Sequence, residues 1–238
     1  MLFNSLTFVV FFALVLAIHN APLSWTTKKT NLLVASYLFY AAWNPPFVVL
    51  VWLSTIIDWH VAKRMFVEQK QRRRKMLHAV SVAVNHGILG YFKYGGFLLD
   101  NFIVISASVG IDYQAPDWSI VLPVGISFYT FQTMAYSLDV YLRRAEPSKS
   151  FLDFALFVTF FPQLVAGPIV RPAHLLPQYA VPRVATPQQL YWGLGLITIV
   201  MFQKIVVADG LLAQSADMVF SAQDTLHPLD AWLGTLAF

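Results

Sequence analysis

The chain has 238 residues, of which 58% are hydrophobic and only 12% charged, and its mean hydropathy is +0.61. Soluble domains carry roughly 45–50% apolar and about 25% charged residues, so the composition excludes both disorder and an ordinary soluble fold. The chain has no cysteine, which excludes disulfides, a thiol nucleophile and thiolate-bound metal sites. The net charge of +4 is concentrated in one short run beside apolar stretches, which favours a topology signal over nucleic-acid binding.

The apolar stretches predict membrane-spanning helices. At about 20 residues for each span, the length accommodates five or six of them. The opening stretch has no basic n-region and no cleavage site, so we interpret it as a retained first span. The sequence therefore predicts an all-α, polytopic integral membrane protein with one membrane domain over 1–238. The predicted stretches are 2–18, 31–60, 77–99, 119–141, 151–170 and 189–208, with another beginning near 229.

Two of these stretches are not plain helices. Pro45 and Pro46 interrupt 31–60, and two consecutive prolines remove hydrogen-bond donors and disfavour a continuous helix. The stretch 151–170 is broken in its C-terminal half, where irregular backbone survives at membrane depth only beside protein or a wet cavity. It is either a kinked span or a re-entrant element that lines a cavity. The residues that break it are Pro162, Gly167 and Pro168.

The distribution of positive charge favours the re-entrant interpretation. Seven basic residues and one acidic residue lie between Lys63 and Lys75, and the positive-inside rule places this run in the cytoplasm. The loop 100–118 has no Lys or Arg, as expected outside. The basic residues directly after 119–141 then lie inside, and Arg171 and Arg183 also lie inside only if 151–170 enters the membrane and returns. For the first 60 residues, a single crossing and a broken hairpin both remain open.

The sequence offers no strong catalytic motif. It lacks H-E-x-x-H, G-x-S-x-G and the P-loop, and we expect structural roles for its six histidines. Lys93, in GYFKYGGF, either extends to the interface or faces an internal cavity. Gln132 lies deeper in a span, where an amide usually bonds to a neighbouring helix. Asp139 is expected to pair with Arg143, and Asp58 is expected to be structural.

The segment FFPQLVAGPIVRP, residues 160–172, is the strongest local feature. Its prolines and glycine would free backbone groups, while Gln163 and Arg171 add polar side chains. Such a combination suits the binding of a ligand at membrane depth, although a simple kink is the alternative.

Several motifs together resemble the bacterial membrane-bound O-acyltransferase family, in its alginate O-acetylation branch. The specific ones are LPVGISFYTFQ and FPQLVAGPI, and weaker ones are MLFNSLTF, STIIDWHVAKR and GYFKYGGF. The resemblance implies a ring of tilted helices in a bacterial plasma (inner) membrane, crossed several times. It also implies a thioester donor, most plausibly acetyl-CoA, from the cytoplasm and an acceptor hydroxyl from outside, with no bound cofactor or metal.

The family's general base is a histidine in a W-H-G motif, which does not occur among these residues. The chain resembles the N-terminal half of the family, so no catalytic residue is carried over, and we expect these 238 residues alone to be inactive. The implied partners are membrane lipid, a polysaccharide acceptor such as alginate, and periplasmic acetylation proteins. We expect the cavity to be lined by Lys93, Gln132, Gln163, Gly167, Pro168 and Arg171.

Two other functions remain open. Broken helices with polar residues also suit a transporter or channel component, although the sequence shows no internal repeat. A non-catalytic membrane scaffold that pairs with another subunit is the third interpretation.

Overall fold

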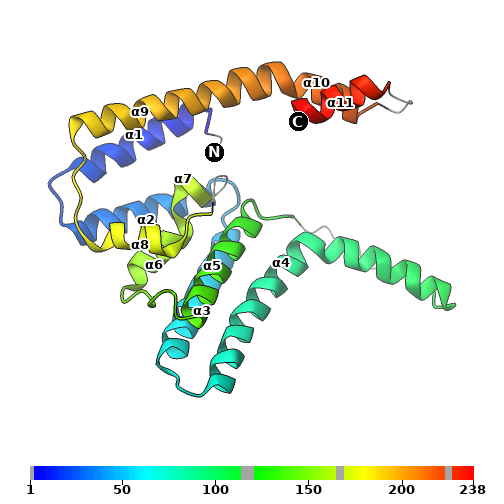
Figure 1. The fold of residues 1–238 in the computed structure, drawn as a ribbon, viewed down its shortest axis with the longest axis horizontal. Helices are drawn as coiled ribbons and strands as arrows, with labels where there is room; N and C mark the ends of the chain where they lie inside the picture. Colours follow the sequence, from blue (N-terminus) through cyan, green and yellow to red (C-terminus); the bar gives the residue numbers. More distant parts are fainter. Residues whose placement is uncertain (1–2, 114–120, 165–168, 223–226) are drawn as a thin grey trace. The chain divides into compact units, whose positions relative to one another are not determined.

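The computed structural model describes residues 3–113, 121–164, 169–222 and 227–238, and every regular element within those ranges is a helix (Figure 1). This confirms the all-α prediction. In chain order the elements are α1 Leu6–Asn20, α2 Trp25–Ala41, α3 Phe47–Val67, α4 Gln71–Ser108, α5 Ile126–Tyr141, α6 Phe151–Thr159, α7 Phe161–Leu164, α8 Pro172–Ala180, α9 Pro187–Phe202, the π-helix η1 Gln203–Leu212, α10 Ala213–Phe220 and α11 Pro228–Ala237.

Two helical stretches are long and apolar enough to cross a bilayer. They are α4 and the continuous run Pro187–Phe220, which joins α9, η1 and α10. Both extend beyond the predicted spans, because the expected loops after residues 99 and 208 begin as helix. Helix α4 continues to Ser108 because the residue that ends it is Gly110, which has φ +80°. There the N–H of Gly110 bonds to Ala107 O and that of Ile111 to Ser106 O, which is a Schellman cap.

Prolines and glycines set several of the other helix boundaries. The predicted break in 31–60 is confirmed, since α2 ends at Ala41 and α3 begins at Phe47, directly after Pro46. A proline at the start of a helix is compatible with it, because the first N–H groups have no intrahelical partner. Helix α5 begins later than predicted, after Gly125 in the left-handed conformation at φ +73°.

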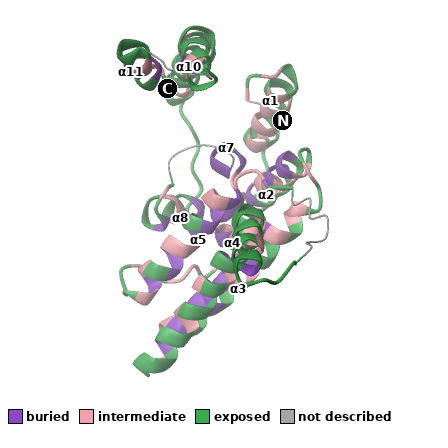
Figure 2. Cartoon of the chain, turned by 90° about the vertical axis from the view of Figure 1, so that its right-hand side faces the viewer, coloured by how far each residue is buried: buried purple, intermediate pink, exposed green. Residues whose placement is uncertain are grey.

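Contacts divide the chain into two compact units, of which the first is Val10–Pro182. Within it α3, α4 and α5 contact one another, and α6 contacts α2, α3, α5 and α8. Figure 2 shows buried residues alternating with exposed ones along helices of this unit. The second unit comprises Arg183–Phe238 with the first residues up to Val9. There α10 packs on α11 so closely that a Cβ on Gly234 would lie 2.5 Å from Val219.

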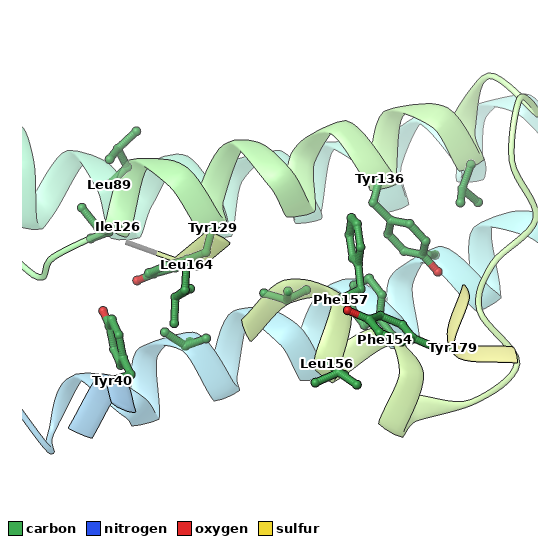
Figure 3. Packing of buried hydrophobic residues seen from close by; sticks show 14 of the residues in the cluster. Tyr40, Leu89, Ile126, Tyr129, Tyr136, Phe154, Leu156, Phe157, Leu164 and Tyr179 are labelled. Carbon is green, nitrogen blue, oxygen red and sulfur yellow. The ribbon is translucent and has the colours of Figure 1, made fainter. Parts of the chain in front are cut away.

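Aromatic side chains fill the core of the first unit (Figure 3). Tyr136 packs on Phe154 with ring centroids 4.5 Å apart, and Phe157 and Tyr179 lie in the same group. Tyr40 and the residues around it form the other part of the cluster. Lipid tails are as apolar as these side chains, so in a bilayer close packing is what holds such helices together.

The chain runs away from the start of α2 along α6 and comes back to it along α8. At the far end of α6, the N–H of Phe161 donates to the Ser36 hydroxyl at 3.2 Å. At the near end, Lys29 on α2 forms a partly buried ion pair with Asp153 on α6. One turn before Lys29, the Trp25 indole donates to Tyr179 O on α8 at 2.7 Å. The segment 151–180 therefore returns to the end of α2 at which it started, as a re-entrant element would.

Breaking the Lys29–Asp153 pair tests this arrangement. Lys29→Ala leaves a partly buried carboxylate without its cation, so we expect the free energy of unfolding to fall by about 3 kcal/mol. The double variant Lys29→Met/Asp153→Leu removes both charges, and we expect it to regain most of that loss. Unfolding by SDS in mixed micelles measures both effects.

The matched control is Lys204→Ala, which breaks the exposed pair of Lys204 with Asp209. Exposed pairs contribute little, so its unfolding curve should overlie that of the parent chain. Equal losses in Lys29→Ala and Lys204→Ala would show that α2 does not anchor α6.

Candidate functional site

The break between α6 and α7 leaves backbone carbonyls without helical partners. Phe160 has ψ 112°, which ends α6, and α7 begins at Phe161. In a continuous helix, Phe157 O would accept from the N–H of Phe161, but that N–H donates to Ser36 instead. The N–H that would serve Val158 O is missing, because residue 162 is proline. Such carbonyls must find other donors if the region is buried.

Two predicted site residues supply those donors. The side-chain amides of Gln132 on α5 and Gln163 on α7 each donate to Phe157 O, both at 2.8 Å. Gln132 is fully buried and Gln163 is 8% exposed. The prediction that Gln132 bonds to a neighbouring helix is therefore confirmed. Its Oε1 atom is buried, and no partner is found for it in the described part of the chain.

The other predicted site residues lie elsewhere or outside the described ranges. Lys93 is exposed on α4, where its Nζ is 3.4 Å from Ser127 Oγ and 5.5 Å from the centroid of the Tyr94 ring. Arg171 is exposed and precedes α8. Gly167 and Pro168 lie outside the described residues. The structure thus brings two of the six residues together, on one carbonyl, and the lining role of all six stays a prediction.

A buried polar cluster, absent from the predicted site, connects α3, α4 and α5. Its centre is Asp58, which is fully buried. The Asp58 carboxylate accepts from Ser81 Oγ at 2.5 Å and from Asn85 Nδ2 at 2.8 Å. Asn85 Oδ1 in turn accepts from Ser54 at 2.8 Å and from Thr133 at 3.1 Å. Helical spacing could have revealed part of it, since Ser54 and Asp58, and Ser81 and Asn85, are four residues apart.

The arrangement of the Asp58 cluster indicates a structural role. Its donors are neutral, and in the described ranges no cation pairs with Asp58. Buried carboxylates of this kind are tolerated only when their lone pairs are satisfied by hydrogen bonds. The expectation of a structural role for Asp58 agrees with this geometry.

Two histidines bond within their own helices, and a third contacts α5. Nδ1 of His60 lies 2.8 Å from Ile56 O and that of His86 lies 3.0 Å from Val82 O, each one turn back on the same helix. His78 stacks on Tyr141 at 4.9 Å and bonds to Ser137. Over the described ranges, no three His, Asp or Glu side chains converge on a metal-sized site.

The predicted Asp139–Arg143 ion pair is wrong. Arg143 lies past the end of α5 with φ +56°, so it no longer follows the helical spacing on which the prediction depended. Its guanidinium lies over the Phe66 ring at 5.5 Å instead.

The break between α6 and α7, where both glutamine amides donate to Phe157 O, brings several polar groups together. It combines amide donors, a buried amide oxygen and an interrupted backbone in an otherwise apolar interior. Such groups can hold or orient a polar ligand, and amide N–H groups can stabilise developing negative charge on an oxygen. In this structure their observed partner is the carbonyl of Phe157.

Comparison with curated proteins identifies the relatives of the chain. It is 36% identical over 214 residues to a probable alginate O-acetylase of Pseudomonas putida, covering 89% of this chain and 43% of that protein. It is 31% identical to a peptidoglycan O-acetyltransferase of Helicobacter pylori, covering 88% of this chain and 44% of that protein. This chain is a relative of the bacterial O-acetylases.

These identities agree with the predicted resemblance to alginate O-acetylation proteins. A probable alginate O-acetylase of Pseudomonas aeruginosa is 35% identical over 89% of this chain. The chain spans about two fifths of the length of these O-acetylases. No protein-family model matches the chain, and no solved structure matches it.

Because Gln132 and Gln163 share one acceptor, we expect their substitution to cause a non-additive loss of stability. After Gln132→Ala or Gln163→Ala, Phe157 O keeps one donor, so we expect each single variant to lose about 1 kcal/mol in free energy of unfolding. The double variant leaves a buried carbonyl unsatisfied, which costs about 1–3 kcal/mol more. A double-mutant cycle by SDS unfolding measures the difference.

Gln178→Ala is the matched control, because the Gln178 amide donates to a backbone carbonyl at the exposed surface of α8. We expect it to have little effect. Strictly additive losses at Gln132 and Gln163 would contradict the shared carbonyl.

The Asp58 cluster makes a separate prediction. Ser81→Ala removes a donor to a buried carboxylate, so the free energy of unfolding should fall by about 2 kcal/mol. Ser108→Ala, at an exposed serine of the same helix, should change it little. If both serines proved equally dispensable, the cluster would not hold α3 to α4.

Proposed function

We propose that the chain forms part of a membrane-bound O-acyltransferase that transfers acetyl groups to hydroxyls of an exopolysaccharide such as alginate. The observation that carries the proposal is the similarity to O-acetylases over nearly nine tenths of the chain. The donor in this proposal is a cytoplasmic acetyl thioester, most plausibly acetyl-CoA. Two of the relatives are named for different acceptors, alginate and peptidoglycan, and both acceptors carry carbohydrate hydroxyls.

The proposed transfer forms an ester bond and breaks a thioester bond. The acceptor oxygen attacks the thioester carbonyl, its proton passes to a general base, and the thiolate leaves and takes up a proton. The base that the family resemblance implies is a histidine in a W-H-G motif, which is not among these residues. In this proposal the chain contributes part of the cavity wall rather than the base.

In this proposal, the broken segment that follows α6 forms part of that wall. Gln132 and Gln163 are already held at the break, so their amides are preorganised, as groups that stabilise an oxyanion need to be. Arg171, which is exposed just before α8, would add positive charge toward an anionic donor, while Lys93, Gly167 and Pro168 stay predicted cavity residues. We place this assembly in a bacterial plasma membrane, crossed several times, with periplasmic acetylation proteins as further partners.

A split-protein experiment tests the proposal. The chain is expressed in an alginate-producing Pseudomonas strain without its own alginate O-acetylase, together with the segment of the Pseudomonas putida relative that the chain does not cover. We expect acetyl esters on the secreted alginate from the pair and none from the chain alone. The positive control replaces the chain with the matching segment of that relative.

Two results would contradict the proposal or part of it. If the control pair acetylates and the pair with this chain does not, although both pieces are in the membrane, the transferase assignment fails. A scaffold or a transport component would give that result. Transfer from labelled acetyl-CoA by the chain alone would contradict the expectation that these 238 residues are inactive.

A further inference from the structure

Two groups of basic residues that are far apart in the sequence meet at one end of the first unit. One group surrounds the turn between α3 and α4, and the other follows α5. Their exposed members, here called the basic end, are Lys63, Arg64, Lys70, Arg72, Arg73, Lys75, Arg143, Arg144 and Lys149.

Specific contacts hold the two groups together. The guanidinium of Arg74 is buried and donates to Tyr141 O, and Gln71 Nε2 donates to the Tyr141 hydroxyl at 3.1 Å. The indole of Trp59 donates to Ser148 O at 3.1 Å, and the Ser148 N–H donates to the Tyr136 hydroxyl at 3.0 Å. The loop that carries the second group is therefore fixed against α3, and the charges share one surface.

Little negative charge offsets these nine side chains. The carboxylates at this end are Glu68, Asp139 and Glu146. Glu68 accepts from the backbone N–H of Lys70 at 2.9 Å, which lowers the pKa of its carboxyl, and it lies 3.7 Å from Arg73. It therefore stays charged and offsets one arginine. The remaining excess of positive charge faces outward.

Apolar and aromatic side chains lie among the charges. Val67 is 70% exposed and Met76 is 64% exposed. The ammonium of Lys63 is 4.1 Å from the Trp59 ring centroid, so its charge is held beside an aromatic surface. A mixture of cations and apolar side chains next to a helix long enough to cross a bilayer matches the headgroup level of a membrane.

We propose that the basic end binds the phosphate headgroups of anionic phospholipids in the leaflet that faces it. Clusters of four to eight basic residues next to a membrane helix attract anionic lipid, with about 1 kcal/mol for each Lys or Arg near the surface. The exposed apolar residues favour a lipid over a soluble anion, because they would enter the acyl region beside the headgroups. This inference is independent of the proposed acetyl transfer.

The test measures lipid binding to the purified chain in a neutral detergent. Native mass spectrometry gives apparent dissociation constants for phosphatidylglycerol and phosphatidylcholine at low and high salt. We expect tighter binding of phosphatidylglycerol, weakened by salt, and no salt effect on phosphatidylcholine. Arg72→Gln/Lys75→Gln should weaken phosphatidylglycerol binding by about tenfold or more, since each lost charge is worth about fivefold.

Two further variants keep the test specific. Arg183→Gln/Lys204→Gln removes the same charge from exposed positions outside the basic end, and its affinity should stay within twofold. Arg72→Lys/Lys75→Arg keeps the charge and should bind like the parent chain, which separates charge loss from misfolding.

Three outcomes would overturn the assignment. Equal binding of the two lipids would remove the role of headgroup charge, and equal losses in both charge-removing pairs would remove the role of this surface. Displacement of phosphatidylglycerol by millimolar inorganic phosphate, or by a short oligonucleotide at lower concentration than the lipid, would point to a soluble anion or a nucleic acid instead.

Discussion

The first unit depends on one constraint: a helix broken within an apolar interior must find new partners for the backbone groups that it frees. The break before Pro162 diverts the N–H of Phe161 to Ser36 and leaves Phe157 O to the amides of Gln132 and Gln163. These bonds join α2, α5, α6 and α7 at one place. The polar residues that suggest a ligand site are thus the same ones that make the irregular backbone stable.

Around this break, the helices are held by polar contacts that sit among close-packed aromatic rings. The Asp58 cluster joins α3 to α4 and, through Thr133, to α5, and the Lys29–Asp153 pair joins α2 to α6. In a lipid environment such contacts matter because packing and hydrogen bonds, rather than water exclusion, select one arrangement of helices. On the outer surface of the same unit lies the basic end, which we propose contacts the lipid headgroups.

Local chemistry made the breaks predictable. Two prolines predicted the end of α2 and the start of α3, and Pro162 marked the interruption after α6. Helix lengths were harder, since α4 continues until Gly110 supplies a left-handed cap. Long-range partners could not be predicted: Lys29 and Asp153 are 124 residues apart, and no spacing rule shows that Gln132 and Gln163 meet on one carbonyl. The Asp139–Arg143 pair failed because the chain leaves helical geometry at Arg143.

We expect the broken segment 151–180 to enter and leave on the same side of the membrane. The chain has no cysteine, so single cysteines can be labelled with a membrane-impermeant maleimide in vesicles of known orientation. Cysteines that replace Gln69, Lys149 and Ala180 should all react from the cytoplasmic side, while one that replaces Asp112 should react from the opposite side. Reaction of positions 149 and 180 from opposite sides would contradict the account.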